Sequence, residues 1–148
     1  ALWSVFHVAK SAGSLSAGRA VDRLGARPLI FAGWGVYALI YLAFALATRP
    51  WQVCALFLGY AAFYALTEPA EKALIAEVAG PGRKGLAFGW YNFAIGVAAL
   101  PSSVIFGAIY QAYGALAAFG WGAGLAAVAA LLLAGVGGAV PGAQAGPG

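Results

Sequence analysis

Residues 85–148 read GLAFGWYNFAIGVAALPSSVIFGAIYQAYGALAAFGWGAGLAAVAALLLAGVGGAVPGAQAGPG and contain no Asp, Glu, Lys or Arg. Residues 28–48 and 50–67 form two further runs without a charged residue. Each run is long enough to cross the hydrocarbon core of a bilayer, which takes about 20 helical residues. Helices are favoured over a barrel, because lipid leaves backbone groups without solvent partners and because the runs lack the alternation of barrel strands. The sequence therefore predicts an all-α, polytopic transmembrane helix bundle.

The composition of the whole chain agrees with this class. Of its 148 residues, 64% are hydrophobic and 8% are charged, and the mean hydropathy is +0.88. Soluble domains carry about 25% charged residues, so a soluble enzyme and a secreted disulfide scaffold are excluded. A disordered chain would need the opposite composition. The net charge of +4 is explained by membrane topology, so we expect the lipid bilayer as partner and no nucleic acid.

Five spans are expected within a bundle over residues 1–138, followed by a disordered cytoplasmic tail over residues 139–148. A basic loop joins the first two spans, a tight turn joins the next two, and a charged connection over residues 68–84 follows. We also expect a fragment of a longer protein, because the chain starts in an apolar stretch and has no Met. The expected spans are residues 1–16, 28–47, 51–67, 85–110 and 115–136.

The basic residues predict the orientation of these spans. Cytoplasmic loops of membrane proteins carry an excess of Lys and Arg. The first and third connections contain six of them, whereas Arg49 is alone in the second connection. Both basic connections should therefore be cytoplasmic, with the N-terminus outside and the C-terminus inside. We expect the location to be the cytoplasmic (inner) membrane of a bacterium. The six residues are Arg19, Arg23, Arg27, Lys72, Arg83 and Lys84.

The first basic connection, residues 18–28, reads GRAVDRLGARP. Gly18 permits a close approach between helices, and Gly25 can adopt the positive φ that reverses the chain. Asp22 can accept charge-assisted hydrogen bonds from the neighbouring arginines or from a helix N-terminus. A solvated turn that only sets topology is an equal interpretation of this composition.

The spacing of Gly18, Asp22, Arg23, Gly25 and Arg27 resembles the signature loop of the major facilitator superfamily. That loop is a Gly, three residues, Asp-Arg, one residue, Gly, one residue and Arg. The family has twelve helices in two halves, and the loop lies between helices two and three and again between eight and nine. The resemblance implies that this chain is helices eight to twelve, in the C-terminal half. Helices two to six remain the alternative.

Two further stretches extend the resemblance along the chain. Residues 68–78 and the basic residues that follow look like the connection between the fourth and fifth helices of a half. Residues 96–101 resemble the Gly/Pro-containing helix after it only loosely, since Leu100 precedes Pro101 and no Gly pair follows. This departure weakens any assignment as a drug/proton antiporter.

The resemblance also implies a function. It implies secondary active transport of a small solute by alternating access, with the missing N-terminal half as partner and proton coupling as one option. The acid equivalent to Asp22 helps to latch the cytoplasmic side shut in that family. A non-transporting membrane scaffold or sensor with the same fold is the alternative.

Polar residues within the expected spans are candidates for lining a cavity. His7 and Lys10 lie three residues apart and share a helix face. A cation at the membrane centre costs about 3 kcal/mol or more, so Lys10 should face a water-filled cavity or an acid. The structural alternative is that Lys10 reaches an interface and His7 bonds another helix. Asn92 can line a cavity or bond across helices.

Small and charged residues complete the candidate features. Small residues at Gly89, Gly96, Ser103 and Gly107 form a stripe along which another helix can pack. Glu68 precedes Lys72 by four residues, the favourable order for a helical ion pair. We expect a gate or a loop anchor there, with a simple interfacial ion pair as the alternative. No catalytic set is found and Cys54 is alone, so we expect no enzyme activity, cofactor or metal. The candidate ion-pair residues are Glu68, Glu71, Lys72, Glu77 and Arg83.

Overall fold

The computed structural model describes residues 2–137, which are helical apart from short connections at residue 25, residues 47–49 and residues 80–83. It comprises α1 (Leu2–Leu24), α2 (Ala26–Leu46), α3 (Pro50–Ala79) and α4 (Lys84–Gly137). The predicted all-α class is confirmed, since no strand occurs in this part of the chain. Gly114 has φ 81° and ψ −177° and breaks α4 into two arms, so residues 2–137 form five helical segments. The predicted disordered tail over residues 139–148 lies outside the described residues.

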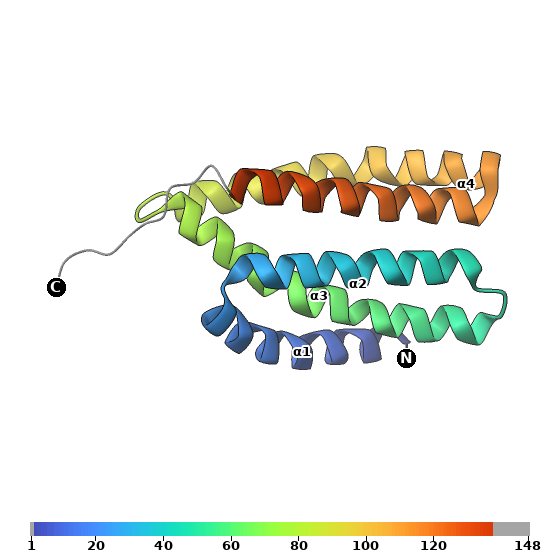
Figure 1. The fold of residues 1–148 in the computed structure, drawn as a ribbon, viewed down its shortest axis with the longest axis horizontal. Coiled ribbons are helices and arrows are strands. Elements are labelled where there is room, and N and C mark those ends of the chain that lie inside the picture. Colours follow the sequence, from blue (N-terminus) through green and yellow to red (C-terminus); the bar gives the residue numbers. More distant parts are fainter. Residues whose placement is uncertain (1, 138–148) are drawn as a thin grey trace.

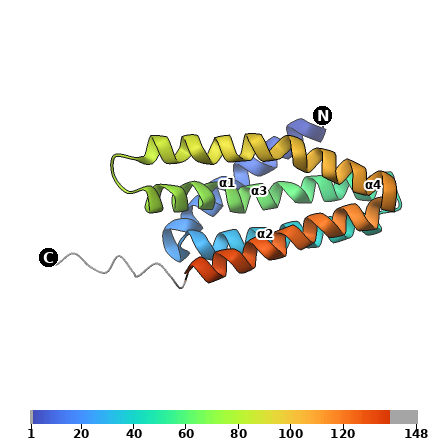
Figure 2. The ribbon, with the colours of Figure 1, turned by 90° about the horizontal axis from the view of Figure 1, so that it is seen from above.

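The helices run antiparallel along one long axis (Figure 1). α3 packs against both α1 and α2, and α2 also packs against α4. Figure 2 shows the two arms of α4 as a hairpin that places its first arm beside α3 and its second arm beside α2. The α1–α2 and α3–α4 connections lie at one end of the bundle, and the α2–α3 turn and the bend of α4 lie at the other.

The helices extend further than the expected spans. α1 continues to Leu24, through most of the expected basic loop, because residues 18–24 contain no Pro and mostly good helix formers. Gly25, with φ 83°, is the single residue between α1 and α2, and its N–H donates to the carbonyl of Val21 at 2.8 Å. α3 continues through Pro69 to Ala79. Its 30 residues reach about 45 Å, which exceeds the hydrocarbon thickness of about 30 Å.

Gln52 caps the turn between α2 and α3. Its Oε1 atom accepts hydrogen bonds from the backbone N–H groups of Thr48 and Arg49, each at 2.9 Å. Pro50 occupies the first turn of α3, where its missing N–H leaves no hydrogen bond unmade. The Gln52 side chain and the backbone hydrogen bonds from Ala47 to Phe44 and from Gln52 to Arg49 therefore close the tight turn that the sequence predicted.

Small residues set the helix contacts. A Cβ at Gly13 of α1 would lie 2.7 Å from the Cβ of Ala65 in α3, and a Cβ at Gly33 of α2 would overlap Thr67. These glycines let the backbones approach closely. The predicted stripe on α4 behaves differently, since no other described element lies within 4 Å of a Cβ at Gly89, Gly96 or Gly107. The buried core between α1, α2 and α3 contains Ala17, Ala26, Leu29, Ile30 and Ala70.

Three of the described helices are long and apolar enough to cross a membrane by length and composition. They are α2, α3 and α4 over residues 84–135, and only 17–22% of their most apolar windows is buried inside the bundle. The break at Gly114 divides α4 into two arms, and the crossing of the membrane by each arm separately stays a prediction. α1 is outside this group, so its crossing of the membrane stays a prediction.

Candidate functional site

Two lysines share one carboxylate where α1 meets α3. Lys10 Nζ lies 2.6 Å from Glu68 Oε2, and Lys72 Nζ lies 2.8 Å from Glu68 Oε1. The exposed fractions are 24% for the Lys10 side chain, 35% for Glu68 and 55% for Lys72. The Lys10–Glu68 pair is thus the better shielded of the two, and shielding strengthens an ion pair relative to one at an open surface.

The local sequence explains how these groups meet. Glu68 and Lys72 are one helical turn apart on α3, so their side chains lie on the same face. Lys10 reaches them from α1 because Gly13 lies against Ala65, one turn away on each helix, and brings the two backbones together. The Lys10 ammonium also lies 5.4 Å from the centroid of the Tyr64 ring, a distance at which the ring attracts a cation.

The three charges line an open cleft of about 460 Å³. Its remaining lining residues are polar or rigid: Ser11 and Ser14 of α1 and Pro69 of α3. The Ser14 hydroxyl donates to the carbonyl of Lys10 at 2.9 Å. The cleft at the α1–α3 contact therefore combines two cations, one anion and the hydroxyl of Ser11.

Glu71 faces a different neighbour from Glu68. Its carboxylate accepts a short hydrogen bond from the hydroxyl of Tyr91, which lies on the first arm of α4. This contact ties α3 to α4, a pair of helices that otherwise pack over a small area. Glu77 and Arg83 are exposed near the α3–α4 connection, and within residues 2–137 neither they nor Glu71 form an ion pair.

The other predicted cavity residues lie apart from the lysine–glutamate cluster. His7 is exposed, and its ring packs edge-on against Trp3 and Phe6, with centroid distances of 4.9 and 5.5 Å. Asn92 is exposed on α4 and donates its amide to the carbonyl of Phe88 in its own helix at 2.9 Å. The structure thus joins Lys10 to an acid but brings neither His7 nor Asn92 to that acid.

The residues of the predicted signature loop lie at the α1–α2 joint. Gly18, Asp22 and Arg23 belong to the last turns of α1, Gly25 forms the joint, and Arg27 belongs to the first turn of α2. Asp22 and Arg23 are exposed and Arg27 is half-buried. These side chains lie on helix ends and not on a flexible loop, because α1 continues to Leu24.

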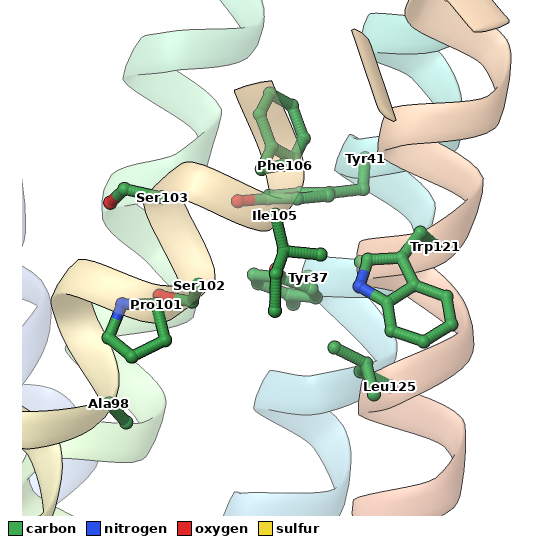
Figure 3. Close-up of a pocket in the computed structure, with 11 residues that line it drawn as sticks. Tyr37, Tyr41, Ala98, Pro101, Ser102, Ser103, Ile105, Phe106, Trp121 and Leu125 are labelled. Carbon is green, nitrogen blue, oxygen red and sulfur yellow. The ribbon is translucent and has the colours of Figure 1, made fainter. Parts of the chain in front are cut away.

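A second cavity, of about 550 Å³, lies between α2 and the two arms of α4 (Figure 3). Tyr37 and Tyr41 enter it from α2, and Trp121 enters it from the second arm of α4. The hydroxyls of Ser102 and Ser103 are satisfied within their own helix, since both donate to the carbonyl of Ala99. Sequence reasoning missed this cavity, although Tyr37 and Tyr41, one turn apart on an apolar helix, were the available signal.

Comparison with known proteins identifies the family. The model of the Major Facilitator Superfamily matches residues 1–146. An uncharacterized MFS-type transporter of Methanocaldococcus jannaschii is 26% identical over 133 residues, which cover 90% of this chain and 33% of that protein. The chain thus spans about a third of the length of this curated relative, and no solved structure matches it significantly. The chain belongs to the Major Facilitator Superfamily of membrane transporters.

Proposed function

We propose that the chain is part of a secondary active transporter that moves a small solute by alternating access. The observation that carries this proposal is the family match over residues 1–146. Lys10 adds support, because it lies within an expected span, pairs with Glu68, and ionisable groups within membrane spans mark substrate or ion pathways. Substrate sites of such transporters lie between two helical repeats that rock against each other.

The chain supplies one part of that machine. It covers 33% of its M. jannaschii relative, and we assign it to helices eight to twelve, the C-terminal half. The alternative assignment is helices two to six, which use the same repeat. The partner in either case is the opposite half of the transporter, and an imposed proton gradient is the driving force to test first.

The arrangement of the connections supports the proposed topology of five spans. The two basic connections lie at the same end of the bundle, and the turn at Thr48 and Arg49 lies at the opposite end. Because positive residues stay inside, the α1–α2 and α3–α4 connections face the cytoplasm of a bacterial cell in this proposal. Asp22 then lies at the cytoplasmic end, where it acts as a latch.

Uptake by proteoliposomes tests the proposal. The complete transporter that contains this chain is reconstituted and given a panel of labelled solutes under an imposed proton gradient. We expect saturable uptake above that of empty liposomes, and no uptake by the chain alone. Uptake by the chain alone would contradict the assignment as one half. Absence of uptake by the complete protein, with correct insertion, would favour a scaffold or sensor.

A further inference from the structure

The α1–α3 cleft carries more positive than negative charge. Lys10 and Lys72 line it, and Glu68 is the one carboxylate among its described lining residues. Glu71 does not line the cleft, because Tyr91 holds its carboxylate toward α4. The three side chains carry a net charge of +1, which attracts an anion to the cleft. One bound monoanion would balance the site, with two ammonium groups facing two carboxylates.

The cleft also has unused hydrogen-bond donors. An ammonium group has three N–H donors, and each lysine contacts a single oxygen of Glu68. Ser11 contributes a hydroxyl that forms no hydrogen bond with the described residues. The volume of about 460 Å³ lies within the usual range for small-molecule sites, about 300–1,000 Å³. The donors and the space therefore suit a compact oxyanion.

We propose that this cleft binds the carboxylate of a small organic anion between Lys10 and Lys72, and that the transported solute belongs to this class. The assignment of the solute rests on the proposed transporter function, whereas the binding site itself does not. Lys10 is the stronger contact, since its side chain is 24% exposed against 55% for Lys72. Ser11 provides a neutral donor beside them.

Calorimetric titration of the full chain in phosphatidylcholine nanodiscs tests the site. Benzoate is the probe, and benzamide is its matched control because it has the same shape without the charge. We expect saturable benzoate binding and none for benzamide. Lys10→Gln should weaken benzoate binding about tenfold or more, as expected for the loss of a charge-assisted contact. Lys84→Gln, on an exposed lysine outside the cleft, should leave the binding unchanged.

Two further variants separate binding from folding. Glu68→Gln removes the competing carboxylate and should tighten benzoate binding, a change that a misfolded protein would not show. Lys10→Arg keeps the charge and should retain binding. Equal binding of benzamide and benzoate, equal effects of Lys10→Gln and Lys84→Gln, or weaker binding in Glu68→Gln would overturn the proposal.

The lipid composition and the uptake assay distinguish the remaining readings. If phosphatidylglycerol in the nanodisc abolishes benzoate binding, the anion is a lipid headgroup and the assignment to a solute is wrong. If benzoate binds as expected but the complete transporter takes up no solute, the transporter proposal fails and the anion site stands. If uptake occurs without benzoate binding to the cleft, this inference alone fails.

Discussion

The close crossing of α2 and α3 depends on the absence of a side chain at Gly33. Thr67 lies opposite, is 2% exposed, and donates its hydroxyl to the carbonyl of Phe63 at 2.9 Å. A methyl group at Gly33 would overlap Thr67 Cγ2, whereas its next neighbours, Leu66 Cβ at 3.5 Å and the Phe63 oxygen at 3.6 Å, are ordinary contacts. Gly33→Ala therefore creates one clash with one identified atom.

The size of the effect follows from the ways to relieve this clash. Rotation of Thr67 would break its hydrogen bond, and separation of the helices would loosen the packing around Ile30, which is 2% exposed. Overpacking of this kind costs about 1–3 kcal/mol, against a gain of about 0.5–1 kcal/mol from replacing glycine in a helix. We expect Gly33→Ala to lower the free energy of unfolding by about 1–2 kcal/mol.

Unfolding by SDS in mixed bicelles measures this change. Gly35→Ala is the matched control, because it lies on the same helix with nothing within 4 Å of the added methyl. Thr67→Ser removes the clashing methyl and keeps the hydroxyl, so the double variant should recover most of the loss. Equal stability of the two alanine variants, or no recovery with Thr67→Ser, would refute the close-packing argument.

Three further outcomes are expected. In intact cells without the native cysteine, a membrane-impermeant thiol reagent should label Thr48→Cys and spare Leu24→Cys; labelling of the latter would reverse the proposed orientation. Gly114→Ala should destabilise the bundle by about 1–3 kcal/mol in the same unfolding assay, since Gly114 has φ 81° and ψ −177°, a backbone conformation that is essentially restricted to glycine. Unchanged stability would argue against the sharp bend. Asp22→Asn should slow uptake by the complete transporter at unchanged abundance, because a helix-end charge interaction is worth about 0.3–2 kcal/mol. Glu77→Gln should leave uptake unchanged. Equal uptake rates for the two variants would leave Asp22 with no latch role.

The helical class could be predicted from sequence, but the helix ends could not. Runs without charged residues indicate where lipid surrounds the chain. A helix can continue beyond the lipid, so these runs do not give the helix ends. Gly25 follows the last residue of α1 and Gly80 follows the last residue of α3, each with positive φ, and both helix ends lie beyond the expected spans. Pro69 was a plausible end of α3. Within a helix a proline removes one hydrogen bond, yet α3 continues through Pro69 to Ala79.

The partner of Lys10 shows a second limit. The cost of an intramembrane cation indicated that Lys10 needs an acid or water. It could not indicate which acid, because Glu68 lies on a helix far along the chain. The choice depends on the register of α1 against α3, which follows from Gly13 lying against Ala65. Glu68 and Lys72, by contrast, are neighbours by helical geometry alone.

The exposed first arm of α4 explains why apolar content alone says so little about packing here. Every residue from Asn92 to Ile105 is exposed, which would be untenable for such a sequence in water. Lipid removes that penalty, so helices associate through small residues that permit close contact and not through apolar area. Gly13 and Gly33 make such contacts, whereas Gly96 faces no described neighbour. The arm therefore presents a small-residue surface that lipid, or the opposite half in the proposed transporter, is able to cover.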